Sequence, residues 1–195
     1  MIRSIQRQLL ALVLGTACVA SPGAWAAGYG AGIIDHYDGA TGLYFRTITA
    51  DKMPKGLVSS YKPRTIITNL FIFNPENEAS NRFFEETPKG EITDILFESG
   101  ITDGQIDVIS IGGGWRFKHN TGLPEGRTPR DKLLVGVKDE DTDNITLYVA
   151  NKHGENRSVL TVVPAGAEWH IDAANGKLRV IREEDGKLII ESFDW

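Results

Sequence analysis

The most concentrated group of possible metal ligands in this chain is the run Asp139-Glu140-Asp141-Thr142-Asp143-Asn144. Asp139, Asp141 and Asp143 stand at alternate positions, which is how loops present carboxylate oxygens to Ca²⁺. An EF-hand loop is not completed, because Asn144 stands where glycine is needed and Ala150 where a bidentate glutamate is needed. A solvated turn between two strands explains the same residues, since charges at a hairpin tip discourage edge pairing. We therefore expect a turn here, with Ca²⁺ as the one candidate cofactor.

Two aromatic positions are candidates for ligand binding. Trp115 and Arg116 follow three glycines, without the Lys-Ser/Thr pair of a phosphate-binding loop. Tryptophan and arginine are common anchors of protein interfaces, so Trp115 and Arg116 could hold a protein partner. Trp115 and Tyr37 could equally stack on a sugar ring. Packing in the core competes with both interpretations.

The sequence shows no motif of a known catalytic type. There is no G-x-S-x-G nucleophile turn, and the four histidines do not have the spacing of a zinc site. Carboxylates are abundant, so a hydrolase that uses paired acids stays open. We expect no catalytic residues and interpret the chain as non-enzymatic.

Residues 1–26 are predicted to be a secretory signal peptide. Arg3 and Arg7 precede the apolar run 9–20, and Ala24-Trp25-Ala26 is a small-residue cleavage site. The predicted mature protein, a single domain over residues 27–195, is then periplasmic or secreted. It carries 19 basic and 26 acidic residues, a net charge of −7, and no cysteine, because Cys18 lies in the signal. This charge argues against nucleic acid as a partner, and no later segment is apolar over a membrane-spanning length.

Short strands separated by Gly, Asn, Asp and Pro dominate the remaining sequence. Asn175-Gly176 and Asp185-Gly186 predict tight hairpin turns, because these residues tolerate positive φ. The predicted strands are 33–34, 43–49, 65–73, 82–85, 91–98, 105–111, 133–137, 145–149, 158–163, 169–172, 177–182 and 187–193. No window has a helical period. The expected fold class is all-β and antiparallel.

The stretch 147–169 resembles the blade repeat of TolB-type β-propellers. The matching positions are Leu147, Tyr148, Val149, Asn151, Gly154, Asn156, Arg157, Leu160, Thr161, Pro164 and Trp169. Residues 175–181 are similar to the start of a following blade. The resemblance implies a small or partial propeller, which could close by assembling subunits into a homo-oligomer; a β-sandwich is the alternative.

The expected function is that of an exported module that binds a protein partner through its loop faces. A carbohydrate-binding module that uses exposed aromatic residues is the first alternative, and a carboxylate-dependent hydrolase the second. We also expect Trp195 to be packed, in a final strand that pairs with the first strand and closes the sheet.

Overall fold

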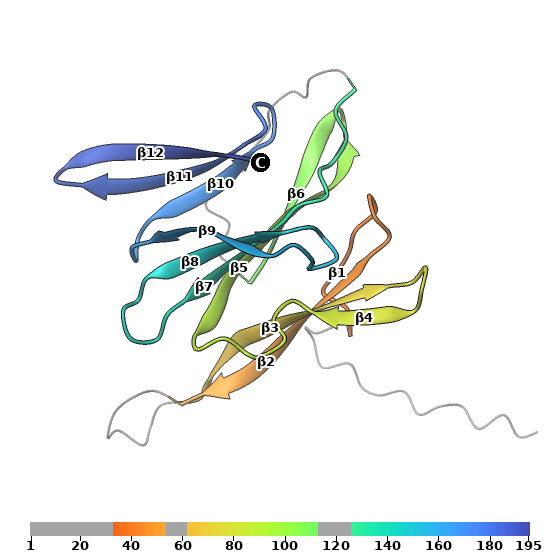
Figure 1. The fold of residues 1–195 in the computed structure, drawn as a ribbon, viewed down its shortest axis with the longest axis horizontal. Coiled ribbons are helices and arrows are strands. Elements are labelled where there is room, and N and C mark those ends of the chain that lie inside the picture. Colours follow the sequence, from red (N-terminus) through yellow and green to blue (C-terminus); the bar gives the residue numbers. More distant parts are fainter. Residues whose placement is uncertain (1–32, 54–61, 113–125) are drawn as a thin grey trace, which may run out of the picture. The chain divides into compact units, whose positions relative to one another are not determined.

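The computed structural model describes residues 33–53, 62–112 and 126–195. This part of the chain is all-β and antiparallel, as predicted, with twelve strands and no helix (Figure 1). Accordingly, the described residues hold no helix long and apolar enough to cross a membrane. The predicted signal peptide, Trp115 and Arg116 lie outside the described residues.

The strands follow the chain at short intervals. Their bounds are β1 His36–Tyr37, β2 Tyr44–Lys52, β3 Arg64–Asn74, β4 Ala79–Arg82, β5 Glu91–Thr102, β6 Gln105–Ile111, β7 Leu133–Lys138, β8 Ile145–Ala150, β9 Ser158–Val163, β10 Glu168–Asp172, β11 Lys177–Glu184 and β12 Lys187–Asp194. β3 ends at Asn74 because Pro75 follows, and a proline has no N–H to donate to the ladder.

Nine strands form one sheet in the order β1-β2-β3-β5-β7-β8-β9, with β4 added to β3 and β6 added to β5. β3 and β5 are joined through a single register pair, Ile67 with Ile92. The sheet therefore has two portions, β1–β4 and β5–β9. Buried side chains from both portions, among them Phe45, Leu70 and Phe97, meet in one hydrophobic cluster.

The other three strands form a separate sheet in the order β10-β11-β12. Both of its turns were predicted: Gly176, Asp185 and Gly186 have φ of 60°, 53° and 70°. A second hydrophobic cluster joins this sheet to the other face of β5 and β7 and contains Leu96, Leu134, Trp169 and Trp195. Since β5 and β7 are covered on both faces, they carry continuous apolar runs in place of alternation.

Three strand predictions were wrong. The first strand is His36–Tyr37 and not 33–34, because its partners across the hairpin are Phe45 and Tyr44. The fourth strand is Ala79–Arg82 and ends where the prediction began it. Beyond it, the Asn69 side chain accepts a hydrogen bond from the Phe84 backbone N–H at 3.1 Å and donates one to the Phe84 carbonyl at 2.8 Å. This side chain takes the place of a ladder partner, so both Phe83 and Phe84 can turn into the core.

For the final strand, the predicted residue range was right but the predicted pairing was wrong. β12 pairs with β11 and not with the first strand, because the two-residue turn at Asp185-Gly186 returns the chain directly onto β11. The prediction for the last residue was right: Trp195 is completely buried.

Candidate binding surface

Three aromatic side chains cross the outer face of the β1–β4 portion in register. Tyr37 on β1 is opposite Tyr44 on β2, and Tyr44 is opposite Phe73 on β3. Their ring centroids are 4.9 Å apart for Tyr37–Tyr44 and 6.1 Å apart for Tyr44–Phe73. Directly opposed residues of an antiparallel pair point to the same face. We call Tyr37, Tyr44 and Phe73 the aromatic row.

The aromatic row faces outward because the alternate residues of the same strands face inward. Phe45 on β2 and Ile72 on β3 are buried, and successive residues of a strand point to opposite faces. Tyr37 is 53% exposed, and Tyr44 and Phe73 are half-buried. Large aromatic side chains left on an outer sheet face are unusual enough to suggest a binding role.

A second row lies beside the first on the same face, two residues further along the strands. Arg46 on β2 is opposite Phe71 on β3, and Phe71 is opposite Arg82 on β4. The Arg82 guanidinium carbon lies 5.4 Å from the centroid of the Phe71 ring, within the range of a cation–π contact. We call Arg46, Phe71 and Arg82 the arginine row. Both arginines are exposed.

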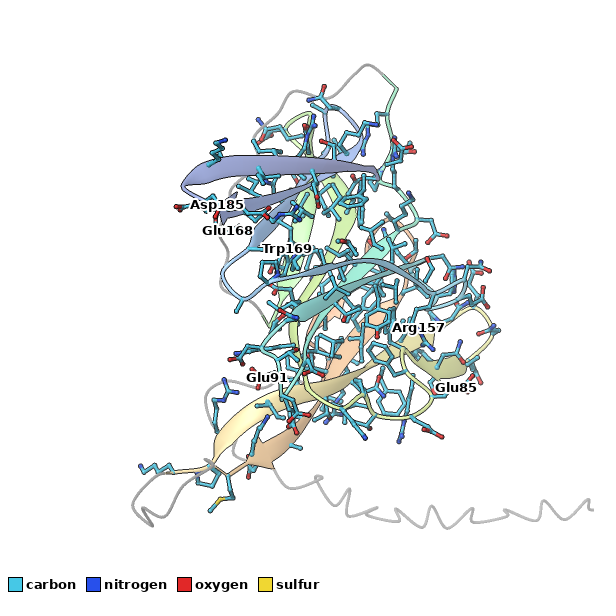
Figure 2. All side chains as sticks on the ribbon, turned by 60° about the vertical axis from the view of Figure 1, so that its left-hand side comes forward. Glu85, Glu91, Arg157, Glu168, Trp169 and Asp185 are labelled. Atoms are coloured by element: carbon cyan, nitrogen blue, oxygen red, sulfur yellow. The ribbon has the colours of Figure 1, made fainter. Side chains whose placement is uncertain are left out.

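The two rows run into a cleft of about 630 Å³ at the free edge of β4. Ser80, which is opposite Phe73, and Arg82 belong to both the sheet face and the cleft. The full lining is Ser80, Asn81, Arg82, Phe83, Glu85, His153, Gly154, Glu155, Asn156 and Arg157. Figure 2 shows Arg157 and Glu85 near each other on this side of the protein.

Arg157 is held in a fixed position on the wall of this cleft. It donates to the Phe83 carbonyl, and its guanidinium carbon lies 5.5 Å and 4.9 Å from the Phe83 and Phe84 ring centroids. The positive φ of Asn156 and Gly154 turns the chain between β8 and β9. The cleft therefore offers amide, hydroxyl, guanidinium and carboxylate groups, which suit a polar ligand.

Buried polar contacts hold the first strand, which carries Tyr37, in place. Asp38 and Lys152 are both fully buried, and the Lys152 ammonium lies 2.7 Å from the Asp38 carboxylate. The ammonium also donates to the Glu98 backbone carbonyl. His36 Nε2 is 3.2 Å from the Ser99 hydroxyl. Burial lowers the pKa of His36, with nearby Asp38 raising it and Lys152 lowering it further.

The contacts of His36 do not form a catalytic triad. Asp38 accepts its hydrogen bonds from Lys152, from the Thr41 hydroxyl at 2.5 Å and from the Ala40 N–H at 3.1 Å. No hydrogen bond between Asp38 and His36 is found among the described residues. The Asp38 carboxylate therefore does not orient the His36 imidazole, as the acid of a catalytic triad would.

The acidic turn 139–144 connects β7 to β8. The Asp139 carboxylate accepts from the Asp141 and Thr142 N–H groups at 3.0 and 2.8 Å. The hydrogen bond from the Thr142 N–H, followed by the one from Asp141, lowers the pKa of Asp139. Asp143 pairs with Lys138 at 2.9 Å.

No group of three or more His, Cys, Asp or Glu side chains within ranges 33–53, 62–112 and 126–195 converges as a metal site would require. Calcium binding by Asp139, Asp141 and Asp143 stays a prediction from the sequence.

Of the predicted ligand residues, the structure describes Tyr37 and places it at one end of the aromatic row. The sequence analysis missed Tyr44, Phe73, Arg46 and Arg82. One signal was present in the sequence. The run Leu70-Phe71-Ile72-Phe73 is apolar on both faces of a strand, so either other residues cover both faces or one face is left with exposed aromatic side chains. Comparison with protein-family models, with curated proteins and with solved structures found no match. The resemblance to TolB-type propellers stays a prediction.

Proposed function

We propose that this protein is an exported, non-enzymatic module that binds a glycan chain. The binding surface is the aromatic row together with the cleft beside β4. The observation that carries the proposal is the alignment of Tyr37, Tyr44 and Phe73 across three strands. Aromatic faces give a large contact area at a low cost in side-chain entropy.

A glycan suits this surface better than a small apolar ligand. The row is open and elongated, and it leads into a cleft lined by Ser80, Asn81 and Asn156. The apolar faces of sugar rings can lie on Tyr37, Tyr44 and Phe73, while the hydroxyl groups of the same chain reach the amide groups of the cleft. A site for a small apolar ligand would instead be enclosed and would bury most of that ligand.

The experiment is a glycan array followed by calorimetry on the ligands that bind, with matched variants of Tyr37. Removing the ring in Tyr37→Ala should weaken binding at least tenfold, as expected for an interface anchor. Tyr37→Phe keeps the ring and should bind nearly as well as the wild type. Equal binding by Tyr37→Ala and the wild type would contradict the proposal.

Export is part of the same proposal and rests on the predicted signal peptide. When the full chain is expressed in a bacterial host, the periplasmic fraction should contain a protein whose N-terminal residue is Ala27. Mutating Ala24 and Ala26 to large residues should block this processing. An uncleaved N-terminus in the wild type would count against export.

A protein partner is the second candidate, and the free edge of β12 favours it. Leu188 and Ile190 are 70% and 54% exposed on this edge strand, and exposed apolar edges are templates for strand pairing. A second copy is a suitable partner, because two antiparallel β12 strands can place Lys187 of each copy opposite Asp194 of the other. Light scattering at micromolar concentration should then give a dimer, which Ile190→Lys dissociates and Val162→Lys on β9 does not. A monomeric wild type would contradict pairing between copies.

A further inference from the structure

The arginine row adds a charge preference to the proposed glycan site. Arg46 and Arg82 flank Phe71 in direct register across β2, β3 and β4. Neighbouring strands are about 4.8 Å apart, so the two arginines are separated by about 10 Å across the sheet. Both lie on the same face as the aromatic row.

Neither arginine has a carboxylate partner within the described residues. The ion pairs found there use other cations, and the Arg82 guanidinium contacts the Phe71 ring. The nearest exposed acids along the β3–β4 hairpin are Glu76 and Glu78 at its tip, and neither is paired with Arg46 or Arg82. Asp35, at the start of β1, accepts from the backbone and hydroxyl of Thr47.

This arrangement runs against the overall charge of the chain. Acidic residues outnumber lysines and arginines by 26 to 21, so a basic residue on such a surface usually has an acid nearby. Here the two arginines are exposed on an aromatic face, one on each side of Phe71. Arg157 extends the path, since it lines the same cleft as Arg82.

We infer that the site takes an anionic glycan, one that carries carboxylate groups on its sugar rings. The inference rests on the proposed function, because the rings are taken to lie on the aromatic row. Guanidinium groups match carboxylates through two parallel N–H donors, and Arg46 and Arg82 can each bind one carboxylate of the same chain. Glu85 on the cleft wall is available for the hydroxyl groups of the sugar, whereas the Glu155 carboxylate accepts a hydrogen bond from the Asn151 side chain at 3.2 Å.

The test compares tetragalacturonate with its methyl ester by calorimetry at 50 mM NaCl. The ester keeps the sugar rings and removes the charges. We expect the acid to bind at least tenfold more tightly than the ester. Each of Arg46→Gln and Arg82→Gln should weaken binding of the acid about tenfold, and should weaken binding of the ester much less, because glutamine keeps polar N–H donors but removes the charge. Raising NaCl to 0.5 M should weaken binding of the acid only.

Arg182→Gln is the control variant, because Arg182 lies on β11 and pairs with Glu191 at 3.0 Å. It should bind both ligands like the wild type. The comparison between acid and ester is made on the wild type, so it decides the question even if a variant is unstable.

Other outcomes would overturn the inference in distinguishable ways. Equal binding of acid and ester, with both lost in Tyr37→Ala, would refute the charge preference and leave the proposed glycan site standing. If tetraglutamate binds as tightly as tetragalacturonate, the ligand is an acidic peptide and not a glycan. If neither acid nor ester binds but the glycan array identifies a neutral ligand, the charge preference is wrong. Failure of every glycan would refute both proposals together.

Discussion

Lys152 and Asp38 form an ion pair of 2.7 Å in which both side chains are completely buried. They are 114 residues apart in the chain. Asp38 begins the turn between β1 and β2, and Lys152 follows β8, so the pair connects the first hairpin to the β5–β9 portion of the sheet. The Lys152 ammonium also lies 5.8 Å from the Phe97 ring centroid.

Breaking this pair from one side should be strongly destabilising. Lys152→Met leaves the Asp38 carboxylate buried without its cation, and we expect a loss of about 3–5 kcal/mol in the free energy of unfolding. The double variant Lys152→Met/Asp38→Leu should lose less than Lys152→Met alone, because it leaves no buried charge. Urea unfolding measures both. A single variant as stable as the wild type would show that the pair is not held in solution.

Trp195 should stabilise the fold through its indole N–H as well as its ring. The N–H donates to the buried Glu98 carboxylate at 3.0 Å, alongside Arg127 at 2.6 Å. Trp195→Phe keeps an aromatic ring but removes this donor, at an expected cost of about 1–3 kcal/mol. In the double variant Trp195→Phe/Glu98→Gln, the two losses should not add, since the residues are in direct contact. Additive losses in a thermal unfolding series would contradict this coupling.

Stability should fall as the pH drops from 7.5 to 5, in part because of His36. Burial lowers the pKa of His36 below its ordinary value of 6.5, so the unfolded chain binds the proton more readily than the folded one. The stabilisation that comes from the lowered pKa of His36 is complete above pH 6.5, and it is lost as the pH falls through the pKa of His36 in the folded state. The urea midpoint of His36→Gln should therefore change less between these pH values. His153→Gln, at the surface cleft, is the control and should behave like the wild type.

A second loss of stability is expected below pH 4, from Asp172. Partial burial raises the pKa of Asp172, but hydrogen bonds from Asn175 and Arg179 outweigh it and lower the pKa below 3.8. The stabilisation is therefore present above pH 3.8 and disappears as the pH falls through the folded-state pKa. Asp172→Asn should be less stable than the wild type at pH 6 and approach it at pH 2.5. A constant difference between the two proteins would contradict this account.

Gly90 should not tolerate a side chain. Its φ is 142°, and a Cβ atom there would lie 2.1 Å from the Lys138 backbone oxygen. Backbone atoms cannot move aside as a flexible side chain can, so Gly90→Ala should cost at least about 2 kcal/mol. Gly39→Ala is the matched control, because a Cβ at Gly39 meets nothing within 4 Å. Similar thermal midpoints for the two variants would refute the close approach.

Local sequence signals predicted most of the strands because each depends on residues close together in the chain. These signals act over a few positions, and the structure confirms them: the alternation of apolar and polar residues, Pro75 after β3, and the turns at Asn175-Gly176 and Asp185-Gly186. The fourth strand was shifted because a side chain distant in sequence, Asn69, bonds the backbone at Phe84. No local pattern contains that contact.

What the sequence by itself determined is the all-β class, the number and approximate position of the strands, and the acidity of the chain. Only the tertiary structure decided which side chains share a face: Tyr37 meets Tyr44 and Phe73, and Arg46 and Arg82 flank Phe71. It also decided that Lys152, a residue type usually found at the surface, is buried against Asp38. The physical reason is that strand order and register are set by contacts between residues far apart in the chain, and these contacts are made only when the whole core packs.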